Sequence, residues 1–512
     1  MADLNALIAA HKFGLGAKAG ETTLIGETPQ AWLQAQLTEV VSTLDEFGLP
    51  SAADGIALFY EFQLAKRQEN NADQPLPGTS VNKKDQLTAF VADIDRMKSE
   101  QMLIEDNGVR GSGLNDTQNT YLQAKKSNLS KPAGDKTSQE LLQEMVALSY
   151  DDIGVRTLHA AITPASFREA LVRFWTDHFN VFSEKSLLVR VTAGAMEREA
   201  IRPNVTGKFF DMLVAVETHP SMLFYLDNWL SIGPNSYVGQ KFTLGLNENL
   251  ARETLELHTL GVGAGYTQDD IISYAKAITG WSVGNPQIQP EKLGSFIFEP
   301  LFHEPGPVTF LNKLYPGTAQ DQGLAILADL AVHDKTAGFI ATKLARHFHS
   351  DTPPQSLIDR LELSFKSSGG DLLVVSSTLV SSPEMWDGSF AKLRNSEEFV
   401  VATLRAFGFD SLTSEQSVFV FNAVAQVPFT YHAPEGWPKD EASWASSSIL
   451  SARLNYANLL ARFIALQPEP STAAQDILGP VLGTKSIDGI SQASDVEQGY
   501  ALMMMSPEFQ RR

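Results

Sequence analysis

Apolar residues recur at helical spacing over most of the chain, whereas the two-residue alternation of a half-buried strand is rare. The stretch 28–46, TPQAWLQAQLTEVVSTLDE, opens with Thr28 and Pro29, a capping residue followed by a first-turn proline, which is typical of a helix start. Helical spacing returns from about 138 and again from 320 to the end. The pattern predicts a mainly α fold, a large multi-helix, bundle-like globular protein.

A second helix start is predicted at Thr163-Pro164. Apolar residues then follow one face at i, i+4, i+7 and i+8, and His178 continues that face at i+11. We therefore expect a helix with one deeply buried stripe. The members of the stripe are Phe167, Leu171, Phe174, Trp175 and His178.

Residues 283–320 interrupt the helical pattern with glycines, prolines and aromatic residues, and they predict a short β-hairpin or an irregular insertion. Before this stretch, Thr267 and Asp270 have the spacing of a capping box, with Asp in place of the usual Glu or Gln. The helix that they start is expected to end at Gly280-Trp281.

Changes in composition suggest three regions. Residues 1–137 form a helical N-terminal region with a polar excursion at 66–137, which we expect to be mobile and to carry one or two peripheral helices. Residues 138–400 form a central helical core that carries most of the motifs, and residues 401–512 form a helical region packed on it. No fixed-period repeat is visible, which argues against a solenoid.

Composition narrows the classes of function. The chain has 512 residues, a net charge of −20 and no cysteine. The acidity argues against nucleic acid as a partner and against a polybasic membrane surface. The lack of cysteine excludes disulfides, thiol catalysis and Cys-based metal sites. No transmembrane run and no signal peptide are visible, so the sequence alone favours a cytoplasmic location.

The densest group of polar residues lies in 247–262, NENLARETLELHTLGV. On an ideal helix Asn249, Arg252, Glu253 and Glu256 share an arc of about 100°, while His258 lies about 180° from Asn249. A zinc-type site that uses both glutamates and His258 is therefore geometrically poor. Gly261 follows the last turn and is a plausible left-handed terminator.

Two interpretations of this arc remain open. Arg252 and Glu256 at i, i+4 could form an ordinary salt-bridged helix face. Alternatively, the helix buries the arc, and its carboxylates are then candidates for acid–base chemistry, because buried carboxylates are costly unless they are paired or bound.

Further candidates are scattered along the chain. His178 lies on an apolar stripe, where it is either a core histidine or a catalytic partner. The helical stretch 334–351 places Lys343, Arg346 and His347 within about 100° of arc, a basic face that could pair with the glutamates or bind an anionic group.

Two loops add polar groups. The segment HEPGPVTF places His303 and Glu304 on a stiff loop suited to binding. The segment YLDN places Asp227 and Asn228 where they could cap a helix or contact a ligand. None of the familiar nucleotide-binding, nucleophile-elbow or zinc-protease motifs occurs.

Several of these stretches together resemble one bacterial family, known as domain of unknown function 1800. The NENLARETLELHTLGV block is the most specific match. The matching segments run nearly end to end: IAAHKFGLGAKAGE, FWTDHFNVF, YLDNWLSIGPNS, NENLARETLELHTLGVGAGYTQDDI, AKAITGWSV, HEPGPVTF, ATKLARHFHSDTPP, EGWPKDEASW and SPEFQRR.

The resemblance implies a predominantly helical bacterial protein and supplies no established activity. Many relatives look exported, so the resemblance adds a periplasmic location as an alternative for this chain. The relatives often occur beside a partner family that resembles sulfatases and alkaline phosphatases, and the resemblance implies such a partner here. The excursion at 66–137 matches none of the motifs.

We therefore carry two hypotheses about function. In the first, the chain is an enzyme with a polar cleft that performs hydrolytic or transfer chemistry on a small or anionic substrate, with a divalent metal as an optional cofactor. In the second, it is a non-catalytic binding or assembly protein whose polar motifs are structural salt-bridge networks. The sequence predicts no oligomeric state. The enzyme hypothesis assigns catalysis to Glu253, Glu256 and His178, and substrate binding to Asn249, Arg252, Asp227, Asn228, His303, Arg346 and His347.

Overall fold

The computed structural model describes residues 4–38, 44, 47–70, 136–286, 289–317, 319–464 and 469–512. Helices dominate these residues, and the predicted mainly α class is confirmed. Residues 71–135 lie outside the described part, and with them lie the peripheral helices and the mobility expected for the polar excursion.

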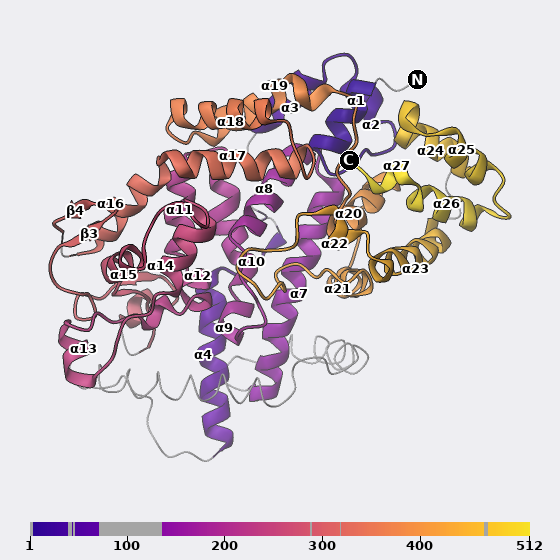
Figure 1. The fold of residues 1–512 in the computed structure, drawn as a ribbon. Helices are drawn as coiled ribbons and strands as arrows, with labels where there is room; N and C mark the ends of the chain where they lie inside the picture. Colours follow the sequence, from indigo (N-terminus) through magenta and orange to yellow (C-terminus); the bar gives the residue numbers. More distant parts are fainter. Residues whose placement is uncertain are drawn as a thin grey trace.

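Figure 1 shows the helices of the described residues in chain order. Residues 4–69 contain α1 (Leu4–Ile8), η1 (Ala9–Phe13), α2 (Glu21–Ile25), α3 (Pro29–Thr38) and α4 (Ala52–Glu69). Residues 138–277 contain α7 (Ser138–Ile162), α8 (Ser166–His178), α9 (Leu187–Arg190), α10 (Ala193–Met196), η4 (Glu197–Ile201), η5 (Arg202–Asn204), α11 (Phe209–Glu217), α12 (Pro220–Tyr225), η6 (Asn228–Leu230), α13 (Tyr237–Phe242), α14 (Asn249–Glu253), η7 (Thr254–His258) and α15 (Gln268–Ala277).

The second half of the chain is also helical. Residues 290–386 contain η8 (Pro290–Lys292), α16 (Gln320–Ala331), α17 (Asp334–Phe348), α18 (Gln355–Ser368), α19 (Leu372–Ser381) and η9 (Pro383–Trp386). Residues 396–510 contain α20 (Ser396–Ala406), α21 (Ser414–Ala423), α22 (Glu441–Trp444), α23 (Ser447–Ile464), α24 (Pro470–Leu478), η10 (Gly479–Val481), α25 (Thr484–Ser491), α26 (Val496–Met505) and α27 (Pro507–Gln510). No described helix combines the length and apolar character needed to cross a membrane.

Local sequence signals explain where several helices begin. Helix α3 starts at Pro29, as predicted, and the capping box of Thr267 and Asp270 at the start of α15 is present. Helix α8 begins at Ser166 rather than at Thr163-Pro164. The Thr163 hydroxyl accepts a hydrogen bond from the backbone N–H of residue 165 at 3.1 Å, so a side-chain turn precedes the helix there.

The strands are short and form two antiparallel pairs. β1 (Trp281–Val283) pairs with β2 (Phe296–Phe298), and β3 (Val308–Phe310) pairs with β4 (Lys313–Tyr315). The loop between β3 and β4 consists of two residues with positive φ of 46° and 61°, the backbone of a type I′ turn. The short hairpin predicted within 283–320 is therefore confirmed.

The buried apolar residues form two clusters. The larger one includes residues of α8, α11, α15, α16 and α17, and the smaller one includes residues of α20, α21 and α23 to α27, while α7 contributes to both. Helix α20 contributes to both, because Val401 belongs to the larger cluster and Phe399 to the smaller. In Figure 1 the elements of the smaller cluster, including α23 and α26, gather on one side of the molecule.

Helix α8 is buried on nearly every side, including the faces that carry its polar residues. The surroundings of the helix are therefore more polar than its apolar stripe alone predicts. The stripe of Phe167 to His178 is buried as predicted, but Arg168, Glu169 and Arg173 are buried as well. Buried charges of this kind need partners. Those of Arg168 include carbonyls of α3 and the Thr206 hydroxyl, and those of Glu169 and Arg173 come from α7, η5 and α20.

Residues 429–439, which we call the strap, cross the C-terminal end of α8. The Asn180 amide donates to the carbonyl of Tyr431 at 3.0 Å, and the Asp177 carboxylate accepts from the N–H of Trp437 at 2.8 Å. The motifs FWTDHFNVF and EGWPKDEASW, far apart in sequence, therefore meet at one place.

Candidate functional site

The helix that carries the polar arc changes its winding in the middle. Helix α14 continues directly into η7, a π-helical turn, and the segment ends at Gly261, whose φ is +89°. The N–H of Gly261 donates to the carbonyl of Leu255 at 3.1 Å. Short π-helical insertions of this kind are frequent at functional sites.

Part of the arc is a salt-bridged face. Arg252 donates to Glu248 at 3.1 Å and lies 3.7 Å from Glu256. The side chains of Arg252 and Glu256 are 36% and 27% exposed, and Asn249 is exposed. For these residues the arrangement is that of an ordinary helix surface.

Glu253 differs from its neighbours. It is half-buried, and within the described part of the chain it has no hydrogen bond and no ion pair. Burial raises the pKa of Glu253, and the carboxylates of Glu256 and Glu435 act in the same direction, while His258 and Arg252 act against it. Burial also raises the pKa of Tyr225, followed by the charges of Glu253 and Glu435. The Glu253 carboxylate is therefore partly desolvated and lies within electrostatic reach of Tyr225 and of Glu435 in the strap.

His178 is connected to the same helical segment. Its Nε2 lies 3.2 Å from the backbone carbonyl of His258, and since a carbonyl only accepts, Nε2 carries the proton. Nδ1 is then an unprotonated acceptor, and it is buried without a partner among the residues that the structure describes. Burial lowers the pKa of His178 well below its usual value, and the charges of Lys343 and His258 add to this.

A second imidazole is held by a carboxylate. His258 Nδ1 lies 2.7 Å from Glu217 Oε1, and the Thr254 hydroxyl lies 2.9 Å from the other oxygen of Glu217. Both Glu217 and His258 are fully buried, and His258 Nε2 has no hydrogen-bond partner in the described part of the chain. Among the described residues, no group of three His, Asp or Glu side chains is arranged to hold a metal ion.

Lys343 completes this group from α17. It is half-buried, its Nζ lies 5.3 Å above the centre of the Phe339 ring, and no carboxylate in the described residues pairs with it. Burial lowers the pKa of Lys343 to about 7. We call His178, Glu217, Glu253, His258 and Lys343 the His178 cluster.

The YLDN residues lie outside this cluster and bind other parts of the chain. The Asp227 carboxylate pairs with Lys185 at 2.7 Å. The buried Asn228 amide donates to the carbonyls of Ile278 and Trp281 at 3.3 Å and 3.1 Å. These contacts attach the YLDN segment to the end of α15 and the start of β1.

The HEPGP loop is bound in a similar way. His303 Nδ1 lies 2.9 Å from the carbonyl of Thr279, and Glu304 accepts from the backbone and side chain of Asn235 at 2.9 Å and 2.6 Å. Both His303 and Glu304 are buried. Hydrogen bonds thus join the segments YLDN and HEPGP to the segment AITGW, residues 277–281. The polar side chains of these segments point to one another's backbone and do not gather on a common face.

The two remaining candidates on α17 have different environments. Arg346 is exposed. His347 is half-buried with its ring 5.3 Å from that of Phe174, and burial, followed by the charge of Arg512, lowers its pKa to about 3.

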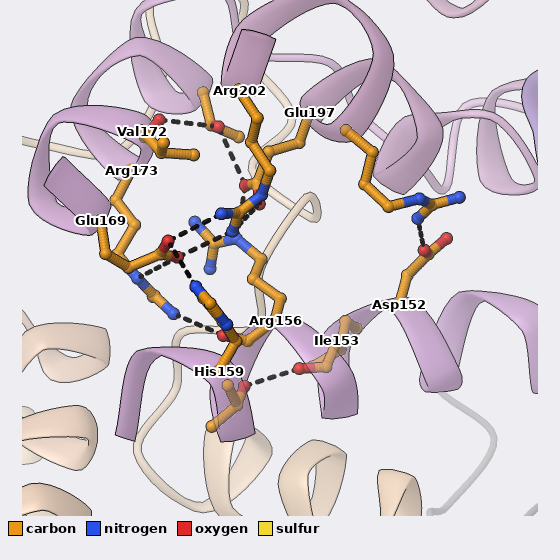
Figure 2. Close-up of polar contacts among 12 residues, drawn as sticks. Asp152, Ile153, Arg156, His159, Glu169, Val172, Arg173, Glu197 and Arg202 are labelled. Carbon is orange, nitrogen blue, oxygen red and sulfur yellow. Dashed lines mark hydrogen bonds and ion pairs between the residues drawn. The ribbon is translucent and has the colours of Figure 1, made fainter. Parts of the chain in front are cut away.

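A further group of polar contacts is an ionic network that the sequence did not reveal. Figure 2 shows Arg202 between two carboxylates. It donates to Glu169 at 2.7 Å and 2.8 Å and to Glu197 at 2.8 Å and 3.2 Å, and Arg156 donates to Glu197 at 2.6 Å. Burial opposes ionisation of Glu197, but the charges of Arg156 and Arg202 hold its pKa well below the usual value.

The network extends to α20. The Glu397 carboxylate accepts from Arg156 of α7 and from Arg173 of α8. Arg173 also lies 3.7 Å from Glu169, one helical turn earlier. Three arginines therefore pair with three carboxylates. Because the positive and negative charges balance, we interpret the network as structural. The i, i+4 spacing of Glu169 and Arg173 was the one available signal, and it concerns only a single pair.

The fold and these contacts define a mainly helical protein in which many buried charges of the described residues are paired, as Glu169, Glu197 and Arg202 are, while Glu253 and Lys343 have no ion pair in the described part of the chain. The family described as "Protein of unknown function (DUF1800)" matches residues 8–511, and the chain belongs to it. No curated protein matches the chain, and no solved structure does either.

Proposed function

We propose that this protein is an enzyme that performs hydrolytic or transfer chemistry on a small anionic substrate, with Glu253 as its general acid or base. The observation that carries the proposal is the environment of Glu253. It is a half-buried carboxylate with a raised pKa and no partner in the described residues, whereas Glu169, Glu197 and Glu397 all have arginines. A pKa moved toward neutrality suits a group that must both take up and release a proton.

The surrounding side chains support this assignment. His178 offers an unprotonated Nδ1 that can accept a proton or a hydrogen bond, and His258, oriented by Glu217, offers Nε2. His258 is an electrostatic neighbour of both Glu253 and His178, which links the carboxylate to the imidazoles. The exposed Arg346, three residues after Lys343 on α17, is placed to attract an anionic group.

The test is a comparison of Glu253→Gln with Glu248→Gln. Glu248 lies one turn earlier on the outer face and pairs with Arg252, so its replacement is a matched control. With p-nitrophenyl phosphate and p-nitrophenyl acetate as probes, we expect the wild type to hydrolyse one of them. E253Q should lose at least about 100-fold in kcat, the usual contribution of a general acid or base, and E248Q should stay within about twofold.

Equal rates for wild type and E253Q would contradict the role of Glu253, and a wild type that turns over neither ester would contradict the hydrolytic form of the proposal. Folding is checked in parallel by thermal unfolding. Because burial raises the pKa of Glu253, the ionised side chain destabilises the fold at neutral pH, and E253Q should unfold at the same or a higher temperature.

A second candidate function is a non-catalytic binding or assembly protein. The observation that favours it is that Asn228, His303 and Glu304 are buried and bonded inside the chain, as structural residues would be. In that case E253Q should gain stability and change no measurable turnover.

A further inference from the structure

The amine of Lys343 has surroundings that an ordinary surface lysine lacks. It is half-buried on α17 and packs over the Phe339 ring at 5.3 Å, and no carboxylate of the described residues neutralises it. A cation in such a place either acquires a counter-ion or loses its proton.

The position of this amine is defined by the end of the polar helix. Gly261 packs directly against Phe339, since a Cβ at residue 261 would lie 2.8 Å from the ring. The positive φ of +89° at Gly261 also disfavours a side chain. Gly261, which follows η7, therefore packs against the same Phe339 ring over which the Lys343 amine lies.

The Phe339 ring contacts both the Lys343 amine and the His178 ring. Lys343 and His178 are electrostatic neighbours, and Phe339 also contacts the His178 ring, with centroids 6.4 Å apart. Within the described residues, His178 Nδ1 is an unprotonated, buried acceptor without a partner. Such a nitrogen on the same aromatic surface can accept a hydrogen bond that orients an attacking amine.

We propose that Lys343 is a nucleophilic amine that forms a Schiff base with a small aldehyde or α-keto acid. The Nζ lone pair attacks the carbonyl carbon, forming a C–N bond and breaking the π bond of the carbonyl, which gives a carbinolamine. Departure of water then breaks the C–O bond and forms C=N. The amine loses two protons in total, which leave with the oxygen as water, so no oxidant or reductant is required.

This assignment is independent of the role of Glu253. It concerns a group on another helix, and its chemistry needs no general acid from α14. Burial lowers the pKa of Lys343 to about 7, so a large fraction of the amine is unprotonated at neutral pH, unlike an ordinary lysine.

The experiment is reductive labelling of the wild-type protein at pH 7 with limiting glyoxylate and sodium cyanoborohydride, followed by peptide mapping by mass spectrometry. The exposed Lys335 on the same helix is the internal control. We expect Lys343 to be labelled at least about tenfold faster than Lys335, since far more of it is unprotonated. This ratio should fall as the pH is raised to 10, because an ordinary lysine then begins to lose its proton as well.

Two variants separate this proposal from the previous one. K343M should lose the fast-labelling peptide, and E253Q should keep it even where E253Q abolishes turnover. Labelling of Lys343 no faster than that of Lys335 at pH 7, or a ratio that does not change with pH, would overturn the assignment.

Discussion

At the scale of residues, charge in this protein follows two different patterns. Glu169 and Arg202 lie in a network in which each buried charge meets an opposite one. Glu253 and Lys343 have no such partner in the described residues, and the pKa of each is moved toward neutrality, upward for the carboxylate and downward for the amine. Groups whose pKa the surroundings shift toward neutrality are candidates for proton transfer and nucleophilic chemistry.

The isolation of Lys343 predicts a measurable dependence of stability on pH. Its pKa is about 7 in the folded protein, against 10.5 for an ordinary lysine, so the unfolded chain binds the extra proton between these values. Stability that is reduced at and below pH 7 should therefore be recovered as the pH rises toward 10.5.

The check is chemical denaturation of wild type and K343M at pH 7 and pH 10. The wild type should gain on the order of 2 kcal/mol relative to K343M over this interval, less than full burial would give because the side chain is partly exposed. Parallel curves for the two proteins would show that Lys343 is charged and solvated at pH 7.

Sequence reasoning at this scale selected Glu253 and His178 but did not find Glu217. The arc of 247–260 was visible because its members are close in sequence, and a helical projection needs nothing else. Glu217 lies 41 residues before His258 and meets it only through the packing of α11 against the polar helix. No local pattern could have paired them.

At the scale of elements, helix starts were easier to predict than changes within a helix. A capping box is a local hydrogen-bonding pattern, and that at Thr267 and Asp270 is present as expected. The π-helical turn Thr254–His258 was not predicted, because a projection at a constant angle per residue assumes regular winding.

The strap provides the prediction at this scale. A Cβ at Gly436 would lie 2.3 Å from the backbone oxygen of Asp177 and 2.5 Å from its carboxylate, and φ there is +77°. Gly408 is a matched control, since its φ is +67° but a Cβ at that residue would meet nothing within 4 Å. G408A should cost only the left-handed strain of about 1–2 kcal/mol, whereas G436A should cost more and displace the strap.

Thermal unfolding and Trp437 fluorescence test this difference. Trp437 lies in the strap with its ring 4.7 Å from that of Tyr431, so displacement of the strap should change its emission. If G436A and G408A lose the same stability and leave the emission unchanged, the contact with Asp177 does not hold the strap.

At the scale of the whole molecule, the two apolar clusters of the described residues share the helices α7 and α20. The hydrophobic pattern predicted helices throughout but not which helices pack together, because that depends on contacts between residues hundreds of positions apart. The boundary expected near residue 401 stays a prediction. What links the clusters is polar as well as apolar: Glu397 of α20 binds Arg156 and Arg173, which belong to α7 and α8.

Replacing Glu397 by Gln should therefore weaken the attachment of the smaller cluster to the larger one. The change leaves Arg156 and Arg173 buried with one carboxylate fewer, and removal of one partner from a buried ion pair costs about 3–5 kcal/mol. E362Q is the control, because Glu362 pairs with Lys366 at 2.7 Å with both side chains about one-third exposed, and such pairs contribute about 1 kcal/mol or less. Hydrogen exchange should show faster exchange in α23 and α26 than in α11 for E397Q, and no change for E362Q. Equal acceleration in all three helices would mean that the network stabilises the molecule as one unit and does not join two parts of it.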